Sequence, residues 1–241
     1  MIVWGLSDLH LSLARPDGRE TKFPRRREQT EKIEANWRAC VGRDDIVLIP
    51  GDFSMARDHR DLQADLAWLD RLPGWKVLSA GNHDGWWNGV ERIRKLLRRS
   101  QRAVGGDAIE LPGVIVCGTL GAPYIAEDES PAIASRDPRS KISLSKEIAL
   151  LEKALAQANE LRTDDRPIIV MWHYPPFDRF GRPGPCAELV EAAGAAACVF
   201  GHAHAVNQWA SIPQGLIRGV LYRCVAADAV GFHPLRILDS G

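Results

Sequence analysis

The sequence predicts a layered α/β fold. Three observations support this class: short apolar runs alternate with helical patterns, coordinating polar residues follow several of the runs, and no Gly/Ser-rich linker or internal repeat divides the 241 residues. A chain of this length fits one large α/β domain better than two small ones. We therefore expect a single domain over residues 1–241.

The first part of the chain contains three predicted strands, each followed by a predicted helix. Ile33 and Trp37 lie at helical spacing, and so do Leu62 and Leu66. The strands are expected at Ile2–Leu6, Ile46–Ile49 and Lys76–Ser79, and the helices at Arg27–Val41, His59–Arg71 and Gly89–Ser100.

The remaining sequence continues the alternation around one long loop. Ala122–Lys141 is rich in Pro, Ser and Asp, which is typical of a loop. Ser143–Leu161 is the clearest helical pattern in the chain. Strands are expected at Val114–Cys117, Pro167–Trp172 and Ala196–Phe200, with short strands and turns over Gln208–Asp228.

Composition argues against several classes of protein. Lys plus Arg and Asp plus Glu number 31 each, so no whole-protein charge favours nucleic acid or an anionic membrane. No apolar run approaches the roughly 18 residues of a membrane span, and the first residues lack the features of a signal peptide. We therefore expect no membrane partner. The five cysteines form no CxxC motif, which indicates reduced, mostly buried thiols in a cytoplasmic protein.

Coordinating side chains follow five of the predicted strands. In the stretch VLSAGNHDGWW, an apolar run breaks at Gly81 and three polar residues follow without a gap. Ligands of open α/β sheets bind outside the carboxyl ends of strands, so these residues are expected to converge on one crevice. They are Asp8 and His10, Asp52, Asn82 with His83 and Asp84, His173, and His202 with His204.

Taken singly, each motif has an ordinary explanation as a helix cap, a turn or a solvated histidine. The combination is more specific, because five of the seven histidines fall at these strand ends. The other two, His59 and His233, are expected in surface or packing positions.

The strand-end residues suit a pair of metal ions. Two divalent ions about 3.5–4 Å apart need six or more protein ligands, one of them a shared carboxylate. Carboxylate oxygens and imidazole nitrogens favour Mn, Fe or Zn, and the lack of thiolates argues against a structural zinc site. His83 is left as a spare imidazole with Asp84 beside it. The candidate ligands are Asp8, His10, Asp52, Asn82, His173, His202 and His204.

The ordered motifs D-L-H, G-D, G-N-H-D, H-Y-P-P and G-H-A-H, between residues 8 and 204, resemble those of the calcineurin-like metallophosphoesterase superfamily. The segments PGDFSMA and GNHDGWW are similar to sequences from a bacterial branch of predicted phosphohydrolases. The resemblance implies two mixed β-sheets packed as a sandwich and flanked by helices. One departure is Trp172, which stands where many relatives have glycine and is expected to narrow the site.

The resemblance also implies a role for each motif residue. Asp52 would bridge the two metals, and His83 would stay off them and protonate the leaving oxygen, with Asp84 as its partner. The first metal would be held by Asp8, His10 and His204, and the second by Asn82, His173 and His202.

The implied reaction is hydrolysis of a small phosphomonoester or phosphodiester by a hydroxide that the two metals activate. One alternative is a nuclease or nucleotide pyrophosphatase on the same scaffold, which the neutral net charge disfavours for polynucleotides. The other is a non-catalytic metal-binding scaffold protein, which the complete set of motif residues disfavours. The motifs leave the substrate, the metals and the oligomeric state open.

Two further features have packing or solvent exposure as their default explanation. Trp86 and Trp87 are expected to pack under the loop that precedes them, with base stacking as the alternative. The basic residues are expected to form solvated faces, with phosphate contacts as the alternative; they are Lys22, Arg25–Arg27, Arg98, Arg99 and Arg102.

Overall fold

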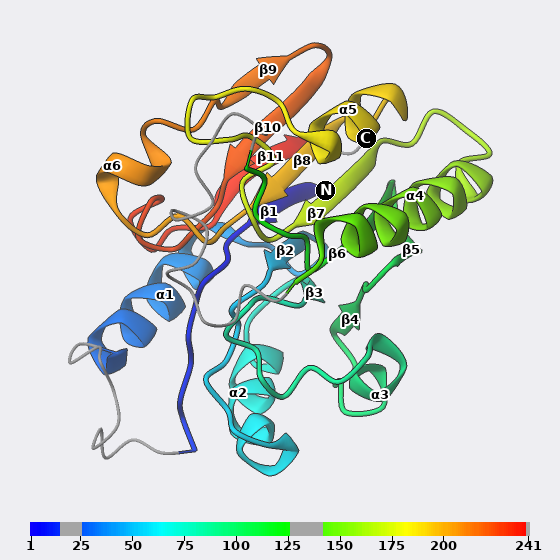
Figure 1. Ribbon diagram of the computed structural model, residues 1–241. Coiled ribbons are helices and arrows are strands. Elements are labelled where there is room, and N and C mark those ends of the chain that lie inside the picture. The colour runs from blue at the N-terminus through cyan, green and yellow to red at the C-terminus, as the bar shows by residue number, and fades with distance from the viewer. Residues whose placement is uncertain (15–25, 126–141, 240–241) are drawn as a thin grey trace.

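Two β-sheets lie face to face at the centre of the computed structural model, and helices cover their outer faces (Figure 1). The structure describes residues 1–14, 26–125 and 142–239. Lys22, Arg25 and all but the first four residues of the predicted loop Ala122–Lys141 therefore lie outside the described residues.

The first sheet has five strands in the order β11-β1-β2-β3-β4. Strands β1 to β4 run parallel, and β11 pairs antiparallel with β1 at one edge. Every residue of β2 is buried, as expected for a parallel strand that is covered on both faces. The strands are β1 Ile2–Gly5, β2 Ile46–Pro50, β3 Trp75–Ser79, β4 Gln101–Ala103 and β11 Leu235–Asp239.

The second sheet has six strands in the order β5-β6-β7-β8-β10-β9. Its central strands β6, β7, β8 and β10 run parallel, whereas β5 and β9 pair antiparallel at the two edges. Both sheets are thus mixed, which confirms the expected fold class. The strands are β5 Asp107–Leu111, β6 Val114–Thr119, β7 Ile168–Trp172, β8 Ala197–Phe200, β9 Gly215–Ile217 and β10 Val220–Cys224.

Two of the helices begin next to a side chain that caps them. The Asp58 carboxylate accepts two backbone N–H bonds at the start of α2, and Ser143 Oγ accepts one at the start of α4. No helix in the described ranges is long and apolar enough to cross a membrane. The helices are α1 Arg26–Cys40, α2 His59–Asp70, α3 Val90–Arg94, α4 Leu144–Leu161, α5 Pro185–Ala192 and α6 Val206–Trp209.

Three apolar clusters hold these layers together. The middle one lies between the sheets, where Leu48 of β2 packs in the same cluster as Met171 of β7 and Val199 of β8. A second cluster joins α1 and α2 to the first sheet, and a third joins α4 and α5 to the second. All five cysteines are free thiols, and four of them are buried. The cluster between the sheets holds the carboxyl ends of the two sets of parallel strands in place relative to each other.

Several elements differ from the sequence prediction. The helix expected over Gly89–Ser100 ends at Arg94, because the chain must then turn to place β4 beside β3. The buried Gln101 secures that turn, since its side chain accepts from the Arg98 N–H and donates to the Leu66 carbonyl. The segment Gln208–Asp228 starts within a short helix instead of a strand. The sequence prediction also missed β4, β5, β11, α5 and α6.

Candidate metal centre

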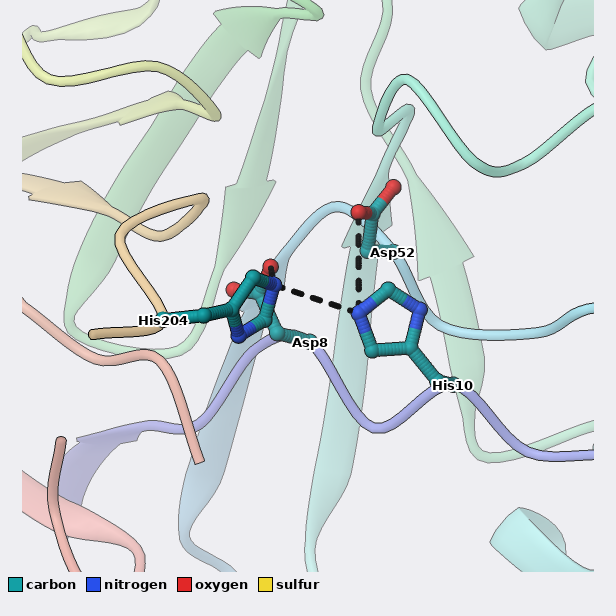
Figure 2. Close-up of side chains that lie close together, drawn as sticks. All are labelled: Asp8, His10, Asp52 and His204. Carbon is teal, nitrogen blue, oxygen red and sulfur yellow. Dashed lines mark hydrogen bonds and ion pairs between the residues drawn. The ribbon is translucent and has the colours of Figure 1, made fainter. Parts of the chain in front are cut away.

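Four of the candidate ligands form one compact group at the carboxyl ends of the parallel strands (Figure 2). Each offers one ligand atom, and these atoms all lie within 4.8 Å of one another. His10 Nε2 lies 3.3 Å from His204 Nε2, and His204 Nε2 lies 3.2 Å from Asp8 Oδ1. Residues nearly 200 positions apart in the sequence therefore lie within a few ångströms of one another. The group consists of Asp8, His10, Asp52 and His204.

A second group gathers around the amide oxygen of Asn82. Asn82 Oδ1 lies 2.8 Å from His173 Nε2 and 2.9 Å from His202 Nδ1. The rings of His173 and His202 are nearly perpendicular, with centroids 5.2 Å apart. Two imidazole nitrogens and one amide oxygen thus meet at the ends of β3, β7 and β8.

Asp52 lies between the two groups and is fully buried. Its Oδ2 atom is 3.8 Å from His10 Nε2 on one side and 3.6 Å from His173 Nε2 on the other. Its Oδ1 atom accepts a 2.7 Å hydrogen bond from the backbone N–H of His83. One carboxylate oxygen therefore faces both groups of imidazoles while the other anchors a neighbouring loop.

Two histidines are oriented by partners behind them. His173 Nδ1 lies 2.9 Å from the Pro50 carbonyl oxygen, so the carbonyl accepts from an Nδ1–H tautomer and Nε2 faces the cluster. His204 Nδ1 lies 3.5 Å from Asp228 Oδ1, which directs its Nε2 toward Asp8. A carbonyl or carboxylate behind the ring is the usual arrangement for a metal-binding histidine.

The backbone at this site is strained. Among the described non-glycine residues with positive φ are four of the candidate ligands, with φ between 45° and 65°. This left-handed conformation costs about 1–3 kcal/mol for each residue and concentrates at functional sites. The four residues are Asp8, His10, Asp52 and His202.

Two motif glycines allow the loops to approach one another. A Cβ atom on Gly81 would lie 2.2 Å from Asp52 Oδ1, and one on Gly201 would lie 2.1 Å from Asp8 Oδ2. Any larger residue would push a carboxylate out of place. The glycines of G-N-H-D and G-H-A-H are therefore required by packing against the acidic residues.

His83 lies at the side of the first group, with its ring centroid 5.3 Å from that of His10. Asp84 is buried, and its carboxylate accepts from the backbone N–H groups of Ser54 at 3.0 Å and Gly81 at 2.9 Å. Burial, followed by the nearby charge of Asp52, raises the pKa of Asp84 to about 8. These contacts tie the loop that carries Asp52 to the loop that carries Asn82; the pairing of Asp84 with His83 stays a prediction.

A family model described as Calcineurin-like phosphoesterase matches residues 1–206, which include all the candidate ligands as well as His83 and Asp84. The chain belongs to the calcineurin-like phosphoesterase family. The resemblance drawn from the five motifs is thereby confirmed.

Individual relatives of this chain match at lower coverage or identity. The Gene 66 proteins of Mycobacterium phages L5 and D29 are 35% identical over 82 residues and 37% identical over 83 residues. Each alignment covers 34% of this chain, and the chain spans about two fifths of the length of these relatives (39% and 40%). The crystal structure of a phosphopantetheinyl hydrolase from Mycobacterium tuberculosis shares the fold, with a TM-score of 0.56, 16% identity, and coverage of 98% of this chain and 95% of that chain.

The electrostatics of the candidate metal centre suit a cation. Burial raises the pKa of Asp8, but the hydrogen bond from His204 and the nearby imidazoles outweigh it and hold that pKa well below its usual range. Burial lowers the pKa of His10 to about 3. Burial also lowers that of His204, but its bonds to Asp228 and Asp8 raise it to about 10. The oxygen and imidazole donors fit a metal ion, which would take the place of the proton that the two carboxylates stabilise on His204.

Sequence reasoning missed Asp228, which supports one of these ligands, and gave Tyr174 packing as its default role without assigning it to a ligand. Asp228 lies behind His204, as described above, and the Tyr174 ring packs on His202 with centroids 4.3 Å apart. Asp228 lies shortly after the end of β10, which runs parallel to β8. The strand-end rule that found the other ligands would therefore also have found Asp228.

The tryptophans named from the sequence occupy packing positions. Trp86 is buried, and its indole N–H donates to the Ser54 carbonyl at 3.0 Å. Trp87 is partly buried and packs against the apolar cluster that contains Trp86. Trp172 is buried among residues of the outer cluster of the second sheet, where Gly121 leaves room for its ring.

Proposed function

We propose that this chain is a dinuclear metal-dependent phosphoesterase that hydrolyses a small phosphomonoester or phosphodiester. The observation that carries the proposal is the position of Asp52 Oδ2, 3.8 Å from one imidazole group and 3.6 Å from the other. A buried carboxylate that faces two sets of donors is the arrangement that a bridged pair of cations needs.

In this proposal each ion takes donors from both sheets. Asp8, His10 and His204 would hold the first ion, and Asn82, His173 and His202 would hold the second, with Asp52 available to both. Mn, Fe and Zn all suit these donors. When bound, the two ions supply positive charge that acidifies water and neutralises phosphoryl oxygens.

The chain contributes positioning and a proton. His83 donates a proton to the leaving oxygen of the substrate, and its backbone bond to Asp52 holds it beside the cluster. Asp84 fixes the same loop through Gly81. His204 is 42% exposed, whereas Asp52 and His173 are fully buried. Solvent and substrate therefore approach the ligands from the His204 side.

A small phosphorylated molecule is the proposed substrate. The balance of 31 basic and 31 acidic residues gives no general attraction for a polynucleotide. We further propose that residues 1–241 act as one domain in a reducing, cytoplasmic setting, which the five free thiols favour.

A metal-resolved activity screen tests this function. The purified protein is loaded with Mn, Fe, Zn or Mg and assayed against aryl phosphates, aryl phosphodiesters and nucleotides. We expect metal-dependent release of the alcohol, with two metals bound per chain. Absence of turnover with every metal, or binding of a single ion in the active protein, would contradict the proposal.

A further inference from the structure

A pocket of about 350 Å³ opens beside the edge strand β4. Four of its eight lining residues are arginines, from α3, the turn that follows it and β4. The sequence predicts a solvated basic face for Arg98, Arg99 and Arg102, with phosphate contacts as the alternative. The lining consists of Arg94, Leu97, Arg98, Arg99, Gln101, Arg102, Ala103 and Ile109.

The positive charge of this segment is not a property of the whole chain. No acidic residue occurs from Arg92 to Gly106, although acidic and basic residues balance overall. Arg94 is neutralised by Glu91 and Asp107, with N–O distances of 2.6 Å to each. The remaining arginines of the pocket have no such acidic partner within the described ranges.

Arg102 is held in position by its surroundings. Its guanidinium lies 4.7 Å from the centroid of the Trp75 ring and donates to the backbone carbonyls of Arg99 and Gln101. Arg98 and Arg99 are exposed, and their guanidinium groups make no hydrogen bond or ion pair with the part of the chain that the structure describes. Two guanidinium groups thus remain available to a ligand, next to a third that is already oriented.

The chemistry of the pocket selects an anion with an apolar part. Guanidinium groups bind phosphate oxygens through paired charge-assisted hydrogen bonds. Leu97, Ala103 and Ile109 offer apolar surface beside them. The volume falls within the range of small-molecule pockets. We infer that this pocket is a second binding site, which takes a small phosphorylated organic molecule with its phosphates on Arg98 and Arg99.

This site is separate from the metal centre. None of the candidate ligands lines it. Trp75 opens β3, whereas Asn82 follows the other end of the same strand, and five strand residues span about 16 Å. In Figure 1, α3 and β4 lie on the opposite side of the view from α6, which begins two residues after His204. Binding here therefore leaves the metal centre accessible.

NMR titration of the ¹⁵N-labelled, metal-loaded protein with phenylphosphonate, a non-hydrolysable analogue of an aryl phosphate that carries both an anion and an apolar ring, tests the inference. The amide signals of Gln101 and Ala103 report on the pocket, and that of Asn82 reports separately on the metal centre. We expect saturable shifts at Gln101 and Ala103. Failure of catalysis would leave this readout unaffected, so the two proposals can fail independently.

A matched pair of variants distinguishes a pocket from diffuse charge. Arg98→Gln/Arg99→Gln should weaken the binding seen at Gln101 by about tenfold or more, the loss of about 1.4 kcal/mol. The control Arg92→Gln/Lys95→Gln removes the same charge from the same segment but changes no pocket residue. It should change the affinity measured at Gln101 by less than about twofold.

Three outcomes would overturn the inference. They are the absence of shifts at Gln101 and Ala103 in the wild type, equal weakening in both variants, and tighter binding of a short single-stranded oligonucleotide whose affinity falls equally in both variants. The last outcome would assign the basic segment to nucleic acid instead of a small ligand.

Discussion

The backbone N–H of His83 donates a 2.7 Å hydrogen bond to Oδ1 of Asp52, so the proposed acid and the proposed bridging ligand are directly linked. The other oxygen of Asp52 faces the imidazoles of His10 and His173. Loss of charge at Asp52 should therefore affect the metals and the acid together.

Asp52→Asn should reduce turnover to background and lower the occupancy of both metals. The amide can still accept from His83, but it no longer supplies negative charge to two cations. Metal content and hydrolysis are measured on the same preparation, with the exposed Asp44→Asn as a control for the chemical change. Hydrolysis at the wild-type rate by Asp52→Asn would refute the bridging role.

His83→Ala should keep both metals and lose about 10²–10⁴-fold in kcat, the usual contribution of general acid catalysis. The loss should be greatest for alkyl esters, whose leaving oxygens need a proton most, and smallest for activated aryl esters. Rates across a series of leaving groups, together with metal content, check this. A loss of metal comparable to that of a ligand variant would show instead that His83 is itself a ligand.

Asp228→Asn should weaken metal binding by about 10- to 100-fold, because its carboxylate lies 3.5 Å from His204 Nδ1 and orients the ring. A competition titration with a chelator measures the affinity directly. The exposed Asp164→Asn serves as a control. Unchanged metal affinity in Asp228→Asn would mean that Asp8 alone is sufficient to orient His204.

The burial of Lys76 should make the free energy of unfolding depend on pH, independently of the metal centre. Lys76 is fully buried, and its Nζ donates to the carbonyls of Leu72 at 2.6 Å and Gly74 at 2.9 Å. Burial lowers its pKa from 10.5 to about 8, against a small opposing effect of Asp70. Between these two pH values the unfolded chain binds more protons than the folded chain, so the free energy of unfolding rises with pH.

Denaturant unfolding of the wild type and Lys76→Met, from below pH 8 to above pH 10.5, checks this. The wild type should gain stability relative to the variant across that window and keep a constant difference below it. A difference that is independent of pH throughout would show that Lys76 has an ordinary pKa in the folded state.

The site was more predictable from sequence than the edges of the fold. Strand-end residues such as Asp52 and His173 lie where parallel strands of buried apolar residues end, a pattern that is visible along the sequence. The orientation of the histidine rings cannot be read from the sequence in the same way. The partner of His204 is a carboxylate from another strand end, and that of His173 is a backbone carbonyl, so each depends on how distant loops pack.

The missed elements are short ones whose pairing is decided by tertiary context. Strand β4 has three residues and depends on its parallel pairing with β3. Helix α5 begins at Pro185 within a stretch rich in proline and glycine that masks its helical pattern, although proline in the first turn is a recognised start signal. Local propensity is weak evidence for elements of this length.

Each proposed ion draws donors from both sheets, with Asp8 and His10 from one layer and His204 from the other. Metal binding is then coupled to the closure of the whole sandwich, because neither half of the polypeptide carries a complete ligand set. Heat or denaturant that separates the layers would release the ions in the same transition. The midpoint of thermal unfolding should accordingly rise with metal concentration, and the proposed ions would then act as cross-links between the layers as well as cofactors.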